Sequence, residues 1–217
     1  MATATKASPK QLAGEIVDRF GRTFAEELGI HVKKNNAEEL FKLLCFAMLS
    51  GIRIGHRLAM AGVKALFDQG WTTPQEMLKT TWRQRTDVLN HSGYARLDES
   101  TSRKLEAMSH LLIDKYGGDL RQLREAAEHD VRRERELLEE VKGIGEVGAD
   151  IFFREVQAAW DEVFPFLDAL ARRVAARLKL PADADELVKL VGREDYVRLV
   201  AGLVRVHLEK QYESLTG

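Results

Sequence analysis

Two short segments of the sequence combine residue types that suit chemistry on an anionic ligand. The first is the run Val141-Lys142-Gly143-Ile144-Gly145, and the second is Leu167-Asp168. A Gly-Ile-Gly turn between two helices leaves the first N–H groups of the second helix without intrahelical partners, and such groups suit a phosphate. Asp168 adds a carboxylate at the start of the helix-like run that continues to Leu178. The first candidate partner is therefore a nucleic-acid backbone.

The residues around the glycine run must form the helices that hold it. Val131 to Glu140 is rich in Arg, Glu and Leu, with Leu137 and Leu138 on one apolar face, and this pattern predicts a helix that Gly143 ends. After the run, apolar residues recur at helical spacing, at Ala149, Phe152, Phe153, Val156 and Trp160. The sequence therefore predicts a helical hairpin with a tight turn.

The same glycines also fit the dinucleotide-binding pattern G-x-G-x-x-G at Gly143, Gly145 and Gly148. That pattern requires a preceding apolar strand, because the loop rises from the edge of a sheet. The segment Arg132 to Glu136 is too charged for a buried strand. We therefore reject a dinucleotide site.

These residues resemble the helix-hairpin-helix DNA glycosylases, the family of endonuclease III, the adenine glycosylase and the small 3-methyladenine glycosylases. The resemblance rests on Val141 to Gly145 with Ala149-Asp150, then on Leu167-Asp168 with Arg173-Val174. It covers residues 36–190. It implies an all-α, two-lobed fold with a cleft between the lobes, and double-stranded DNA with a damaged base as partner.

The resemblance also assigns roles to individual residues. Asp168 is the expected catalytic carboxylate, and the expected contacts to the DNA backbone are Gly143, Ile144, Gly145, Val147 and Gly148. The break after the apolar helix 40–49 is where the family offers a side chain to the gap left by a flipped base, often Gln, and Ile52 or Arg53 stands there instead. The expected base pocket comprises Tyr94, His91 and Trp160. Arg172, close to Asp168, is expected to contact the DNA backbone.

Each of these assignments has a plainer alternative. An Asp that opens a helix, as Asp168 does, commonly serves as an N-cap, and the two roles can coexist. The Gly-Ile-Gly turn fits an ordinary helix connection, and the segment around Ile52 fits a plain helix corner. Tyr94 fits a core aromatic residue, and Arg172 fits a solvated surface charge. The sequence leaves these alternatives open.

Two departures from the family pattern concern the start of the second hairpin helix. Family members that also cut the DNA backbone carry a Lys where this chain has Val147, and Schiff-base chemistry requires an amine. We therefore expect no lyase activity by that route, and Lys142 is interpreted as a solvated or phosphate-facing charge. Glu146 places a negative charge where the phosphate approaches, which suits the helix dipole but weakens DNA binding.

Composition restricts the function further. The chain has 217 residues, 45% of them hydrophobic, and a formal net charge of -1, so any nucleic-acid surface must be a local patch. Cys45 is the single cysteine and lies in an apolar run, so we expect it to be buried in a reduced, cytoplasmic chain. One thiolate does not bind the iron–sulfur cluster of the endonuclease III branch, and we expect no cofactor and no metal. No membrane span or signal peptide is expected, and the protein is expected to be a monomer.

Helix-start signals recur along the chain, with almost no period-2 alternation, which predicts an all-α protein. They occur at Ser8, Asn36, Thr73, Thr81, Asp119 and Asp183. We expect a first helix over 9–28, a helix over 97–116 and a C-terminal helix over 194–215 that packs on the first. The expected lobes are residues 36–165, ending in the hairpin, and residues 1–35 with 166–217.

Three functions compete at this stage. The preferred one is a monofunctional DNA glycosylase that hydrolyses the bond to a flipped damaged base, with an alkylated purine as the best fit. The second is a catalytically inactive helix-hairpin-helix DNA-binding protein, which Glu146 and the near-neutral charge favour. The third is an all-α protein-interaction domain. Salt-dependent duplex binding and base release distinguish the three.

Overall fold

The structure is a computed structural model that describes residues 8–52, 54–95 and 97–216. Every regular element within these ranges is an α-helix or a 3-10 helix, and none is a strand, which confirms the all-α prediction. The chain divides into two compact units. One comprises Leu28–Val163, and the other comprises Met1–Glu27 with Phe164–Gly217.

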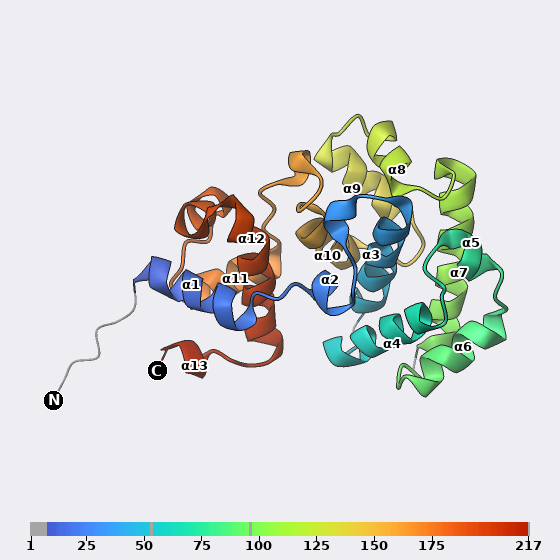
Figure 1. The fold of residues 1–217 in the computed structure, drawn as a ribbon, viewed down its shortest axis with the longest axis horizontal. Helices are drawn as coiled ribbons and strands as arrows, with labels where there is room; N and C mark the ends of the chain where they lie inside the picture. The colour runs from blue at the N-terminus through green and yellow to red at the C-terminus, as the bar shows by residue number, and fades with distance from the viewer. Residues whose placement is uncertain (1–7, 53, 96, 217) are drawn as a thin grey trace. The chain divides into compact units, whose positions relative to one another are not determined.

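The unit Leu28–Val163 is built around one apolar helix, α3. Its side chains are almost completely buried, including Cys45, as predicted, and burial raises the pKa of that thiol. Helices α4, α8 and α10 pack against α3, and Figure 1 shows α3 in the middle of this unit beside α10. The elements are η1 (Val32–Lys34), α3 (Ala37–Ser50), α4 (His56–Asp68), α5 (Pro74–Leu78), α6 (Trp82–His91), α7 (Asp98–Tyr116), α8 (Leu120–Ala126), α9 (Val131–Glu139), α10 (Glu146–Val156) and η2 (Asp161–Val163).

The other unit is built from both ends of the chain. Helix α1 lies beside α12 (Figure 1), and Gly202 allows the two backbones to approach, because a Cβ there would lie 2.7 Å from a methyl carbon of Ile16. Tyr196 and Leu199 of α12 are completely buried, so the predicted packing of the C-terminal helix on the first is confirmed. The elements are α1 (Pro9–Phe20), α2 (Phe24–Glu27), α11 (Ala169–Arg177), α12 (Ala184–Leu208) and α13 (Glu213–Thr216).

The predicted helix starts are correct, because each signal residue caps its helix. Each of these side chains accepts a hydrogen bond from a backbone N–H in the first turn, which satisfies a donor that the helix itself cannot. The capping residues are Ser8, Asn36, Thr73, Thr81, Asp119 and Asp183.

Two predicted helices are wrong in extent. The helix expected over 9–28 ends at Phe20, because Thr23 and Glu26 form a second capping pair in which each side chain bonds the other's backbone N–H, both at 3.1 Å. The helix expected over 194–215 ends at Leu208. Its expected start holds, because Gly192, with a φ of 81° and a ψ of 167°, is not helical and separates it from the helix that Asp183 caps.

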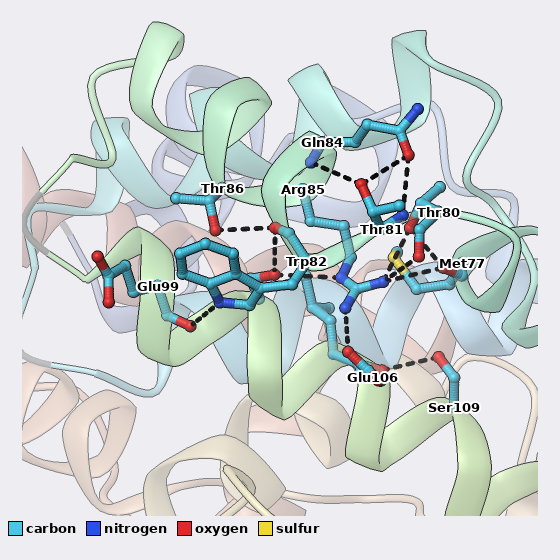
Figure 2. Close-up of polar contacts among 12 residues, drawn as sticks. Met77, Thr80, Thr81, Trp82, Gln84, Arg85, Thr86, Glu99, Glu106 and Ser109 are labelled. Carbon is cyan, nitrogen blue, oxygen red and sulfur yellow. Dashed lines mark hydrogen bonds and ion pairs between the residues drawn. The ribbon is translucent and has the colours of Figure 1, made fainter.

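A buried arginine fixes α7 against α5 and α6 (Figure 2). Arg85 is 1% exposed, and its guanidinium donates to the carbonyl oxygen of Thr80 at 2.7 Å and to Oγ of Ser102 at 3.2 Å. It also forms an ion pair with Glu106 on α7. These bonds satisfy the carbonyl of Thr80, just after α5, and link it through Arg85 to α7. Arg85 therefore holds α7 in place against both elements.

A buried carboxyl pair joins the hairpin's first helix to η2. Glu134 is completely buried, and neither of its carboxyl oxygens meets a hydrogen-bond donor among the described residues. Burial, and the neighbouring Glu162 carboxylate, raise the pKa of Glu134 to about 8. Burial opposes ionisation of Glu162 too, but bonds from Arg124, one of them 2.7 Å long, hold the pKa of Glu162 at about 2. Glu134 therefore carries the proton of the pair at neutral pH.

The proton on Glu134 predicts how the free energy of unfolding depends on pH. The unfolded chain loses the Glu134 proton near its ordinary pKa of 4.5, whereas the folded protein keeps it to about pH 8, so the free energy of unfolding falls as pH rises between these values. We expect Glu134→Gln to remove this fall, because its amide can donate to Glu162 but does not titrate. We expect the stability of the variant relative to the parent to rise by on the order of 4 kcal/mol between about pH 5 and about pH 9, which is about 1.4 kcal/mol for each of roughly three pH units. Urea unfolding at both pH values measures it, and a pH-independent difference would contradict the proton on Glu134.

Candidate functional site

The predicted hairpin comprises α9, a turn over 140–145 and α10. Gly145 is the N-cap of α10, and no side chain caps this helix. Gly145, Glu146 and Val147 are exposed, so the first backbone N–H groups of α10 face solvent. Val141 and Ile144 are buried beneath the turn and anchor it. An uncapped, exposed helix start of this kind can bind an anion.

The glycines of the hairpin are required at some positions and not at others. Gly143 has a φ of 105°, and a Cβ there would lie 2.9 Å from Cδ of Lys104. A Cβ on Gly51, at the end of α3, would lie 3.1 Å from Cα of Gly148, so the start of α10 touches α3 backbone to backbone. A Cβ on Gly145 would meet no atom within 4 Å. Gly143 and the Gly51–Gly148 contact therefore shape the turn, while Gly145 keeps the site open.

An arginine holds the two helices of the hairpin together. Nη2 of Arg135, on α9, donates to Oδ1 of Asp150, on α10, at 2.6 Å. The same guanidinium lies over the ring of Phe153, 5.2 Å from its centroid. Since both charged groups are mostly shielded from solvent, this pair limits motion of the hairpin more than an exposed pair would.

Asp168 is the N-cap of α11 and is 3% exposed. Its Oδ1 accepts hydrogen bonds from the backbone N–H groups of Leu170 and Ala171, at 2.9 and 3.0 Å. The chain leading to it is held from α12, because the hydroxyl of Tyr196 donates to the carbonyl oxygen of Phe166 at 3.2 Å. Burial raises the pKa of Tyr196, so the hydroxyl remains a donor. The N-cap interpretation of Asp168 is therefore correct, and it leaves a carboxylate of fixed orientation.

The structure divides the remaining predicted DNA contacts between the two units. Ile52 is half-buried and directly follows Gly51, which touches the start of α10, so Ile52 lies beside the hairpin. Arg53 lies outside the described residues. Arg172 is in the other unit with Asp168, is exposed, and donates to the carbonyl oxygen of Ala182 at 2.5 Å.

Two of the three residues predicted to line a base pocket are packed in the core. Tyr94 is completely buried, and its hydroxyl donates to the carbonyl oxygen of Leu49 at 3.3 Å. Trp160 is also completely buried, and its Nε1 donates to Oδ1 of Asn35 at 3.1 Å. His91 is exposed, with Nδ1 2.6 Å from the carbonyl oxygen of Asp87. Stacking on a base requires an exposed ring face, so the two buried rings serve as packing here and their stacking role stays a prediction.

Comparison with known proteins identifies the fold. No protein-family model matches the chain, and no curated protein matches its sequence. The structure resembles endonuclease III in a structure described as a trapped endonuclease III–DNA covalent intermediate, estranged-adenine complex. The similarity covers 95% of this chain and 86% of that chain, with a TM-score of 0.50 and 22% sequence identity. The chain has the helix-hairpin-helix fold of endonuclease III. At this identity the likeness establishes the fold, as the residues around Gly143 and Asp168 predicted.

The described residues offer neither a cluster of metal ligands nor a membrane-spanning helix. Within residues 8–52, 54–95 and 97–216, no three His, Cys, Asp or Glu side chains are grouped so that they could hold a metal ion. No helix in the described part of the chain is long and apolar enough to span a membrane.

From the sequence Lys104 is interpreted as a solvated charge, and its place beside the hairpin turn is not predicted. Its aliphatic chain lies on Gly143, although the two residues are far apart in sequence. The sequence contains one indication of an unpaired charge. No acidic residue stands at positions 100, 101, 107 or 108, which lie one helical turn from Lys104.

The turn geometry predicts opposite effects of one substitution at two glycines. Gly143→Ser places a side chain at positive φ and against Lys104, so we expect it to lower the free energy of unfolding by about 1–3 kcal/mol. Gly145→Ser has room and supplies an N-cap oxygen, so stability should hold or rise by a few tenths of a kcal/mol, roughly. Urea unfolding of both variants measures the contrast. Equal losses at the two positions would show that the turn differs from the one described.

Proposed function

We propose that this protein is a DNA glycosylase that hydrolyses the N-glycosidic bond of a damaged base, with an alkylated purine as the substrate. The observation that carries the proposal is the uncapped, exposed start of α10 behind the Gly-Ile-Gly turn, on the fold of endonuclease III. Endonuclease III is described as covalently trapped on DNA, which supports duplex DNA as the partner. The N–H groups of Gly145, Glu146 and Val147 would hold a DNA phosphate.

The proposed reaction uses the Asp168 carboxylate. The target nucleotide leaves the duplex, its glycosidic bond breaks, and the bonding electrons depart with the base. Positive charge then grows on the sugar, where a carboxylate stabilises it and orients a water molecule. The water oxygen bonds to the anomeric carbon and its proton passes to the solvent or the carboxylate. The bonds from Leu170 and Ala171 hold the carboxylate in one orientation during these steps.

The proposed enzyme is monofunctional and acts without a cofactor. Val147, at the position where the lyases of the family carry a lysine, is 57% exposed and offers no amine. The missing lysine and the missing cluster ligands favour the alkylpurine branch. We also propose that the protein acts as a monomer in the cytoplasm, with residues 36–165 and residues 1–35 with 166–217 as its two lobes.

The alternative is a helix-hairpin-helix protein that binds DNA without catalysis. The observation in its favour is Glu146, which is exposed at the first position of α10 and adds a negative charge beside the proposed phosphate. Both functions require duplex binding, so only base release distinguishes them.

Asp168→Asn tests the catalytic carboxylate. Asn caps a helix as well as Asp, so we expect stability within about 0.5 kcal/mol of the parent. Release of an alkylated purine from a duplex should fall by roughly a hundredfold or more, because the variant lacks the negative charge that stabilises the sugar cation. A fully active variant would reduce Asp168 to a helix cap.

Val147→Lys tests why lyase chemistry is absent. The exposed side chain leaves room for a lysine, whose amine should attack the sugar and form a Schiff base that borohydride traps as a protein–DNA adduct. The parent and Val147→Met, which is similar in length but has no amine, should give no adduct. Trapping of the parent would contradict water as the nucleophile, and an active but untrapped Val147→Lys would show that position 147 does not reach the sugar.

A further inference from the structure

Lys104, on α7, lies on the turn of the hairpin. Its Cδ and Cγ are 2.9 and 3.3 Å from the position that a Cβ on Gly143 would take. Its ammonium nitrogen is two bonds beyond Cδ, so the charge lies close to the turn that precedes the exposed amides of α10. The Arg85–Glu106 network fixes α7, which places this lysine on a rigid element.

The charge of Lys104 has no partner within residues 8–52, 54–95 and 97–216. Lys104 is half-buried, and it makes no ion pair or hydrogen bond among the described residues. Many of the other lysines are paired with carboxylates. These are Lys42 with Glu39, Lys64 with Asp68, Lys79 with Glu76, Lys115 with Glu140, and Lys189 with Glu186. An ammonium that is partly withdrawn from water and unpaired is available to an external anion.

We infer that Lys104 is a phosphate-binding residue of the hairpin, acting together with the exposed amides of α10. The inference rests on the proposed function, because it takes duplex DNA as the ligand. It also addresses Glu146: Lys104 and the exposed Lys142 bring two positive charges to the turn, and Glu140, a further carboxylate of the turn, is already held by Lys115. A protein of net charge -1 thereby has a local cationic site for a DNA backbone.

The test measures binding to an undamaged duplex across a series of salt concentrations. Lys104→Met keeps an apolar chain on Gly143 and removes the charge. We expect it to reduce the slope of log affinity against log salt by about one, the release of one counterion, and to weaken binding roughly fivefold to tenfold at low salt. Lys104→Arg should retain the parent slope.

Lys79→Met is the matched control, because Lys79 directly follows α5, outside the hairpin and its turn, and its ammonium is held by Glu76 at 2.6 Å. It changes the net charge equally, and its slope should equal that of the parent. A Lys104→Met protein with the parent slope and the parent unfolding midpoint would overturn the role of Lys104 while leaving the proposed function intact. A parent protein without salt-dependent duplex binding would overturn the proposed function itself.

Discussion

The backbone contact between the end of α3 and the start of α10 is the constraint on which the hairpin depends. A Cβ on Gly51 would lie 3.1 Å from Cα of Gly148, closer than most side chains approach a backbone, so a glycine at position 51 suits the close contact of the two helices. The positive φ of Gly143 then turns the chain directly before α10. Together these glycines leave the first amides of α10 exposed and without a side-chain cap. The proposed anion site therefore depends first on close packing of the backbone, to which Lys104 would add a charge.

Asp168 shows how a structural role and a chemical role can share one residue. Its N-cap bonds satisfy two donors of α11 and hold the carboxylate in one direction. Tyr196 holds the preceding chain, and burial keeps its hydroxyl protonated as a donor. A carboxylate oriented in this way suits stabilisation of a sugar cation, because it needs no rearrangement when the charge develops.

Much of the fold could be predicted from local signals, since capping residues and apolar periodicity are both written in consecutive residues. Asn36 and Thr81 marked helix starts correctly, and the Gly143–Gly145 turn predicted the hairpin. The break at Thr23 was missed because the apolar pattern runs through it, whereas separate helix signals at Asp183 and Glu194 agree with the kink at Gly192. The burial of Tyr94 and the contact of Lys104 with Gly143 depend on residues distant in sequence, which no single-sequence pattern encodes.

The central claim is that this protein removes a damaged base from DNA. Its most direct test is to incubate the purified protein with a panel of duplexes, each carrying one lesion, and to detect free base by mass spectrometry. The account predicts a free alkylated purine and an abasic strand that stays intact until alkali is added. Retention of the duplexes with no free base from any of them would contradict the account and identify a DNA-binding protein without catalysis.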